Sequence, residues 1–311
     1  MKFYPGELCS TYSIVARDPE TGQFGVAVQT HQMSVGRLVP WLIPGIGAVA
    51  TQSLVNISFG PMALTMLREG VGAAHVIAAL AASDENANRR QVAVVDAQGN
   101  AAAWTGQGCI AEAAHHVGEG YSVQANMMSN ATVVSAMASA FENATGDLAV
   151  RMLAALQAAE IEGGDIRGMQ SAALVVVPGD KNVQTWQTDY DLRVDEHASP
   201  LNELVRLVRL RHAQITDEAG SRALDAGDRD TALDHWTKAR REAPELEELP
   251  FWQALKLADE HADIQAAAII LRPVMARNPR SAHWIELIRR LQLCGLIVRD
   301  NAGDELIAAL G

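Results

Sequence analysis

Two carboxamide side chains occupy alternate positions of one predicted strand near the middle of the chain. Gln124 and Asn126 lie within the stretch 121–127, and residues two apart on a strand point to the same face of the sheet. Carboxamides buried inside an apolar sheet must be hydrogen-bonded, because an unpaired buried amide costs free energy. The pair therefore predicts either a structural contact between the two side chains or part of a ligand-binding site.

A second group of polar residues leads into a very apolar predicted strand. Asp165, Arg167 and Gln170 fall in the run 165–171, at the mouth of this strand. An arginine guanidinium can bind a substrate carboxylate through two hydrogen bonds, and Asp165 could hold Arg167 or assist proton transfer. The alternative is an ion pair that only fixes the loop. We keep all three as candidate substrate-binding residues.

Three further candidates stand at strand ends. His31 follows the second predicted strand, and a hairpin with the first strand would bring it near that strand's start. A histidine there could orient a nucleophile or accept its proton, because its unperturbed pKa is near ~6.5; the alternative is a strand-end histidine that faces water. Gln52 and Ser53 close the third predicted strand, where a backbone N–H or a carboxamide could face a developing oxyanion.

Strands and paired helices alternate along the first part of the chain, and they must position these residues. Proline and glycine separate β-branched runs, and apolar residues at helical spacing mark the helices. Strands are predicted over 10–16, 24–30, 46–54, 91–96, 101–105, 121–127, 171–177 and 184–194, and helices over 61–69, 72–82, 132–143, 147–161 and 200–212. Paired helices do not fit a doubly wound parallel sheet, which needs single crossovers. We expect an α+β fold of two stacked antiparallel sheets covered by helices, a four-layer αββα sandwich.

The strand signals end near residue 216, and residues 216–311 predict a small all-α domain of helical hairpins. Small, apolar and proline positions recur there at a constant offset of 35 residues, as Ala232, Trp236, Ala239 and Pro244 and then as Ala267, Leu271, Val274 and Pro279. This offset is close to the tetratricopeptide period of about 34 residues. Pro273 weakens the match, because proline removes a helix hydrogen bond.

The composition argues against several classes of function. The net charge of −12, from 37 acidic and 25 basic residues, would repel phosphate backbones and anionic membranes, so we expect no nucleic-acid partner. The apolar stretch 38–50 is too short and too interrupted to span a bilayer. Three scattered cysteines fit neither a disulfide framework nor a zinc cluster and suit a reducing cytoplasm. We predict no metal and no cofactor, because the histidines lack ligand spacing and no phosphate loop is recognisable.

Several separate blocks of the sequence resemble the DUF1028 family. They are residues 11–19, 25–28, 45–52 and 163–172, and the similarity covers about residues 9–212. The family is of unassigned activity, and its fold is grouped with the N-terminal-nucleophile (Ntn) hydrolases. In such enzymes the first strand begins with a Thr, Ser or Cys whose own α-amino group is the general base. The resemblance implies an Ntn-hydrolase-like sandwich over residues 11–212 with Thr11 as the nucleophile.

The residues before Thr11 depart from that pattern. Ten residues, a leader of 1–10, precede it, whereas family members commonly begin with a methionine directly before the matching residue. Thr11 has no free amine while the leader is attached, so its hydroxyl has only a poor base. Either the leader is removed, or Thr11 works without a free amine, or the domain is not catalytic. Cys9 and Ser10 are competing nucleophile types, and the alternative for Thr11 is a structural or ligand-contacting strand residue.

We therefore expect a cytoplasmic hydrolase of a small-molecule amide or related C–N bond, with Thr11 and His31 as catalytic residues. The alternative is a sandwich that binds a small ligand without turnover, joined to a helical module for assembly. A pair of helical hairpins makes a thin solenoid that needs neighbours to bury its faces. These hairpins should therefore dock on the sandwich or on a second subunit, and we expect a homo-oligomer, a dimer.

Overall fold

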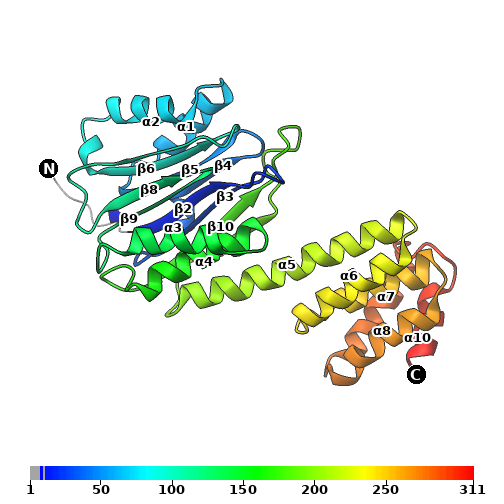
Figure 1. Ribbon diagram of the computed structural model, residues 1–311. Coiled ribbons are helices and arrows are strands. Elements are labelled where there is room, and N and C mark those ends of the chain that lie inside the picture. The colour runs from blue at the N-terminus through cyan, green and yellow to red at the C-terminus, as the bar shows by residue number, and fades with distance from the viewer. Residues whose placement is uncertain (1–7, 10) are drawn as a thin grey trace. The chain divides into compact units, whose positions relative to one another are not determined.

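The chain divides into two compact units, with the boundary between Val208 and Arg209. The structure is a computed structural model that describes residues 8–9 and 11–311. The first unit combines strands and helices, and the second is helical (Figure 1). The boundary falls inside the helix α5 (Pro200–Asp225). Apart from Leu8 and Cys9, the predicted leader 1–10 lies outside the described residues.

The first unit contains two antiparallel sheets. Sheet A has the strand order β1–β5–β6–β7, with β4 also paired to β5, and sheet B has the order β11–β10–β3–β2–β9–β8. Sheet A consists of β1 (Leu8–Cys9), β4 (Pro40–Ile43), β5 (Gly47–Leu54), β6 (Arg90–Asp96) and β7 (Ala101–Thr105). Sheet B consists of β2 (Thr11–Arg17), β3 (Phe24–Thr30), β8 (Ala114–Gly118), β9 (Tyr121–Asn126), β10 (Ser171–Val177) and β11 (Tyr190–Val194).

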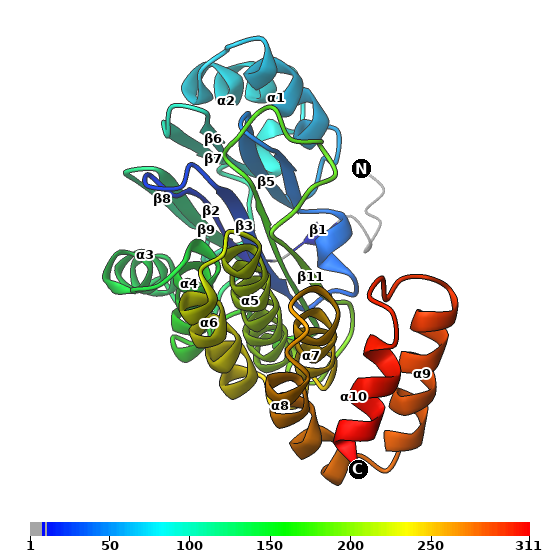
Figure 2. The same ribbon diagram turned by 90° about the vertical axis from the view of Figure 1, so that its right-hand side faces the viewer.

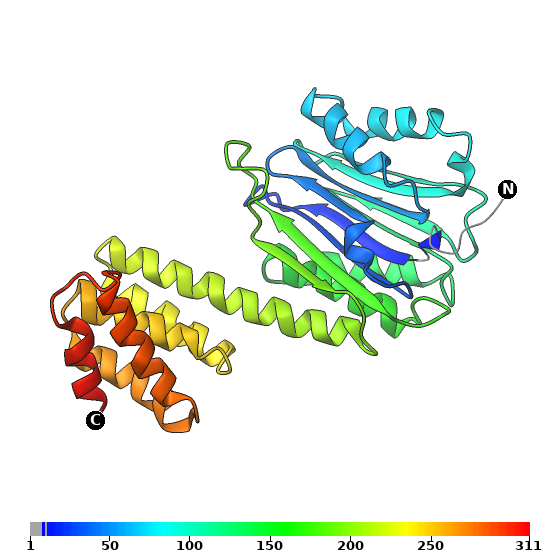
Figure 3. The ribbon, with the colours of Figure 1, turned by 180° about the vertical axis from the view of Figure 1, so that it is seen from behind.

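Helices cover the outer faces of the two sheets. The helices α1 (Phe59–Arg68) and α2 (Ala73–Ala82) lie over sheet A, and α3 (Val133–Asn143) and α4 (Leu148–Ile161) lie over sheet B (Figure 1 and Figure 3). Small and β-branched side chains fill the space between the sheets; Val15, Val28, Ala50, Ala93 and Val175 belong to this cluster. The antiparallel sheets with covering helices confirm the predicted mixed α and β architecture.

The strands that the sequence did not predict lie at sheet edges. Among the described strands, β4 pairs only with β5, and it begins at a proline, which an edge position tolerates. The strand β8 pairs with β9 and has four exposed residues, so it lacks the alternation that marks a half-buried strand. The predicted strand 184–194 is shorter, starting at Tyr190, and the predicted helix 200–212 continues to Asp225.

Antiparallel helices build the second unit around a large apolar cluster and a smaller one (Figure 2). They are the end of α5, then α6 (Arg229–Glu242), α7 (Glu248–Glu260), α8 (Ile264–Arg277), α9 (Ser281–Leu293) and α10 (Ala302–Leu310). The equivalent repeat positions Trp236 on α6 and Leu271 on α8 are both fully buried in the large cluster. The side chains of Asp228 and Asp263 cap α6 and α8 by accepting backbone N–H groups of their first turns. Among the described helices, none is long and apolar enough to cross a membrane.

Candidate functional site

A row of polar residues crosses sheet B where β2 begins. Thr11 is the register partner of Asn126 on β9 and of Thr30 on β3, and Thr30 is the partner of Ser171 on β10. All four residues are fully buried. Register partners point to the same face of a sheet, and Val15, on the same face of β2 as Thr11, packs between the sheets. The row therefore faces sheet A.

Two glutamines of sheet A meet this row across the space between the sheets. Gln52 on β5 and Gln91 on β6 are register partners and are fully buried. Gln52 Nε2 donates to the backbone oxygen of Thr11 at 3.2 Å and to Gln91 Oε1 at 2.8 Å. Asn126 Nδ2 donates to the same Gln91 Oε1 at 3.0 Å. Gln91 thus joins the carboxamides of both sheets beside Thr11.

The residues two positions further along β2 and β9 extend this network. Ser13 Oγ donates to Gln52 Oε1 at 2.6 Å, and Gln124 Nε2 donates to Ser13 Oγ at 2.6 Å. Ser122 Oγ completes the chain by donating to Gln124 Oε1 at 2.9 Å. Gln124 and Asn126 share the face that their spacing predicts, and each bonds to neighbouring strands. Their place in a ligand site stays a prediction.

The hydroxyl of Thr11 lies beside this network but does not bond to it. Thr11 Oγ1 is buried and has no hydrogen-bond partner among the described residues, although the Thr11 backbone oxygen accepts from Gln52. An unpaired buried hydroxyl costs about 1–3 kcal/mol. Such groups in native proteins are rare and point to a catalytic role, an unseen water or a bound ligand.

Two residues with a strained backbone lie next to the network. Ser53 and Met127 adopt the left-handed conformation, with φ of 70° and 59°, and they directly follow Gln52 and Asn126. Non-glycine residues in this region cost roughly 1–3 kcal/mol each and cluster at functional sites. Ser53 Oγ also donates to Cys109 Sγ at 3.4 Å. Burial raises the pKa of the Cys109 thiol, so this cysteine is a poor nucleophile at neutral pH.

A separate cluster forms in the loop before β10. The Asp165 side chain is completely buried and pairs with Arg167, with Nη2 to Oδ2 at 2.9 Å and Nε to Oδ1 at 3.1 Å. The backbone N–H of His31 donates to Asp165 Oδ2 at 3.2 Å, and the backbone N–H of Gln170 donates to Thr30 O at 3.0 Å. These contacts favour the alternative in which the ion pair fixes the loop.

The His31 ring does not reach the network. His31 is exposed and lies just beyond the end of β3. Among the described residues, no hydrogen bond joins this ring to Thr11. The hairpin register is as predicted, since Thr11 pairs with Thr30, but the chain bends after Thr30. A catalytic role for His31 stays a prediction without a supporting contact.

Comparison with known proteins places the first unit in a family. Residues 11–204 match the sequence profile of a family described as "Family of unknown function (DUF1028)". The chain belongs to the DUF1028 family. It is also similar to the crystal structure of protein SPO2555 from Silicibacter pomeroyi, which carries the same DUF1028 label. That similarity has 31% identity and a TM-score of 0.58 and covers 64% of this chain and 88% of that chain. No curated protein matches the chain.

The DUF1028 match begins at Thr11 and spans the whole polar network, including residues that the sequence analysis missed. Gln91, Ser13, Thr30 and Ser171 were not among the candidates, although all are buried polar residues that face the space between the sheets. Two of them carried a local signal. Ser13 is two positions from Thr11 on one strand, and Thr30 lies opposite Thr11 in the hairpin. Gln91 had no such signal, because its role depends on the register between β5 and β6.

The chemistry of the DUF1028 network is that of hydroxyl and carboxamide groups. Its named side chains are Thr11, Ser13, Gln52, Gln91, Gln124 and Asn126. Such groups can donate and accept hydrogen bonds with a neutral polar ligand. In residues 8–9 and 11–311, no group of three or more His, Cys, Asp or Glu side chains is arranged to hold a metal ion.

Replacing the central glutamine, Gln91→Leu, should destabilise the first unit by about 2–3 kcal/mol, because buried donors of Gln52 and Asn126 lose an acceptor. Urea-dependent hydrogen exchange of peptides from β5 and β9 would measure the loss. The control is Gln98→Leu, at an exposed position of the turn after β6, which should change these opening free energies by less than about 0.5 kcal/mol. Equal effects of the two substitutions would contradict a central role for Gln91.

Proposed function

We propose that the first unit is an Ntn-hydrolase-like amidohydrolase that cleaves a small-molecule amide or related C–N bond with Thr11 as the nucleophile. The observation that carries this proposal is the Thr11 hydroxyl, which starts a central strand, is fully buried, and has no hydrogen-bond partner in the described part of the chain. Two facing sheets covered by helices support an Ntn-like sandwich. The strained residues beside Gln52 and Asn126 support a functional site at the same place.

The proposed chemistry uses the α-amino group of Thr11 once residues 1–10 are removed. An α-amino group has a pKa near ~8, so a useful fraction is unprotonated at neutral pH. It accepts the proton of Thr11 Oγ1 as this oxygen attacks the substrate carbonyl carbon. The C–N bond then breaks, the proton goes to the departing amine, and water hydrolyses the threonine ester to release a carboxylic acid.

The carboxamides beside Thr11 are the proposed oxyanion donors. Gln52 Nε2 donates to the backbone oxygen of Thr11 at 3.2 Å, and Asn126 Nδ2 does so at 3.5 Å. A substrate carbonyl next to Thr11 could accept from the same groups. Fixed donors aimed at a developing negative charge stabilise the transition state. Substrate-binding roles for Ser53, Gln124, Asp165, Arg167 and Gln170 stay predictions.

Intact-mass analysis of the purified full chain tests the requirement for a free amine. We expect a species that begins at Thr11, and the hydrolysis of small amides should follow the amount of that species. A full-length protein that hydrolyses amides as well as the shortened one would overturn the amine as the base. A full-length protein without activity, which gains none when its first ten residues are removed, would overturn the hydrolase.

One observation favours a second candidate function. Leu8 and Cys9 are paired with Leu54 and Ser53 as strand β1 of sheet A, so part of the leader is built into the fold. A sandwich that retains its leader would bind a small polar ligand at the network without turning it over. The tetratricopeptide-like hairpins, the homodimer and the cytoplasmic location all stay predictions.

A further inference from the structure

The helical second unit contains a cavity of about 250 Å³. It lies between the end of α5, which contributes Asp217 and Ser221, and α7, which contributes Trp252, Lys256 and Glu260. The segment after α9 closes it with Leu296 and Ile297. Every lining residue belongs to the second unit, so the cavity is independent of the network around Thr11 and of the function proposed for it.

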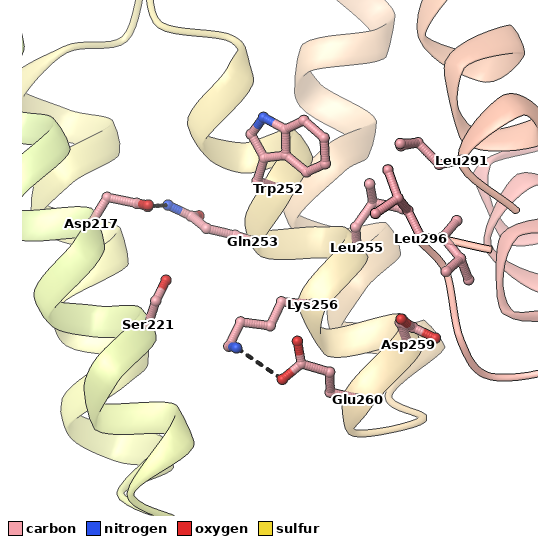
Figure 4. A pocket seen from close by; sticks show the side chains of 11 residues that line it. Asp217, Ser221, Trp252, Gln253, Leu255, Lys256, Asp259, Glu260, Leu291 and Leu296 are labelled. Carbon is pink, nitrogen blue, oxygen red and sulfur yellow. Dashed lines mark hydrogen bonds and ion pairs between the residues drawn. The ribbon is translucent and has the colours of Figure 1, made fainter. Parts of the chain in front are cut away.

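One wall of the cavity is apolar and partly exposed. Leu255, Leu291 and Leu296 gather on one side, opposite Asp217 and Ser221 (Figure 4). Trp252 is 51% exposed and Leu296 is 70% exposed, so both are accessible to a bound molecule. Trp252 is held by an edge contact with Phe251, with ring centroids 5.1 Å apart. The wall offers an indole face and a branched aliphatic surface to a bound molecule.

The cavity also has acidic side chains in its lining. Asp217, Asp259 and Glu260 line it together with one cation, Lys256. The Lys256 ammonium is already bound by Glu260 at 2.8 Å and by Asp225 at 2.6 Å, so its charge is compensated. The lining therefore has more acidic than basic side chains.

Among the cavity residues, Asp217 is an acid whose charged form is disfavoured by burial. Its carboxylate accepts a hydrogen bond from Gln253 Nε2 and is attracted by the Arg240 guanidinium, yet burial, the larger effect, raises its pKa. A raised pKa means that the charged carboxylate is incompletely stabilised by its surroundings. A cation placed beside Asp217 would supply the missing stabilisation, whereas an anion would be repelled.

We propose that this cavity binds a small organic cation whose charged group is carried on an aromatic or branched apolar body. The charged group lies beside Asp217 and Glu260, and the body packs on Trp252 and Leu296. An aromatic face next to a cation adds a further attraction. Pockets that combine an apolar wall with a few convergent polar groups are typical of small-molecule sites.

Three probes that share one ring and differ in charge test this proposal with the full chain. Benzamidine is cationic, benzamide is neutral and benzoate is anionic. Titrations followed by the indole N–H signal of Trp252 in NMR should show binding of benzamidine, at least about 10-fold weaker binding of benzamide, and none of benzoate. Benzamide that binds as tightly as benzamidine, or the absence of benzamidine binding at about 10 mM, would overturn the proposal.

Variants that remove one negative charge test whether benzamidine binds in this cavity. Asp217→Asn and Glu260→Gln should each bring benzamidine binding to within about 3-fold of benzamide, as isothermal calorimetry would measure. The matched control is Glu286→Gln on α9, an acid that is not among the cavity-lining residues and should leave benzamidine binding unchanged. Glu260→Gln keeps the test decisive if Asp217→Asn disturbs the bond to Gln253. Unchanged benzamidine binding in a folded Asp217→Asn or Glu260→Gln protein would contradict the site.

Discussion

Replacing Thr11 by alanine is expected to lower the hydrolysis of a small amide by at least about 10³-fold, because it removes the attacking oxygen. Thr11→Ser keeps a hydroxyl and should retain measurable turnover. The assay is the release of ammonia or amine from a panel of small amides by the full chain, and Thr21→Ala, at an exposed turn residue, is the matched control. Unchanged turnover by Thr11→Ala would remove this residue from the mechanism.

The stability of the same variant separates a catalytic role from a structural one. Thr11 Oγ1 has no hydrogen-bond partner among the described residues. Removing this hydroxyl therefore takes no hydrogen bond away from any of them. We therefore expect Thr11→Ala to keep the free energy of unfolding within about 1 kcal/mol of the original value or to raise it. A large loss of stability together with a loss of turnover would instead favour the structural alternative for Thr11.

Trp236→Ala is expected to destabilise the second unit by about 3–5 kcal/mol. The Trp236 side chain is completely buried and packs in the cluster that holds the helices together. Its indole also lies against α5, since a Cβ atom added to Gly220 would come within 2.6 Å of Trp236 Cδ1. Urea-dependent hydrogen exchange of peptides from α6 and α8 would report the loss.

Trp252→Ala is the control for this prediction, because the same residue type on α7 is 51% exposed. Its loss should cost about 1 kcal/mol or less. Equal destabilisation by Trp236→Ala and Trp252→Ala would show that the buried cluster does not hold this unit together.

Central strands and the edge strand β7 (Ala101–Thr105) were predictable from local pattern, whereas the edge strands β4 and β8 were not. The strand 24–30 was predicted with the bounds that β3 has, because its β-branched residues are bounded by glycine and turn residues. The strands β4 and β8 lie at edges and carry proline or exposed residues, so their sequences lack the apolar alternation. The spacing of apolar residues in a sequence indicates which side chains are buried. The strands β4 and β8 exist because their backbones pair with a neighbouring strand, and that pairing leaves no such pattern.

In the candidate site, contacts between residues close in sequence were predictable, and contacts between distant residues were not. Arg167 and Asp165 are two residues apart, and their ion pair could be expected from the sequence. His31 directly follows Thr30, the register partner of Thr11, as the hairpin predicts, and its side chain is exposed. Gln91 joins two sheets through residues far away in the sequence. Such a contact depends on strand register and sheet stacking, which no short motif records.

The path of the chain before Thr11 limits how far apart the two sheets can lie. Cys9 is paired with Ser53 in sheet A, and Thr11 is paired with Thr30 in sheet B, with a single residue between them. Two Cα steps span at most about 7.6 Å, whereas facing sheets ordinarily lie about 10 Å apart. The intact peptide link therefore holds the end of β1 in sheet A close to the start of β2 in sheet B. Cutting it beside Thr11 would free the amine and would also disconnect β1 from β2.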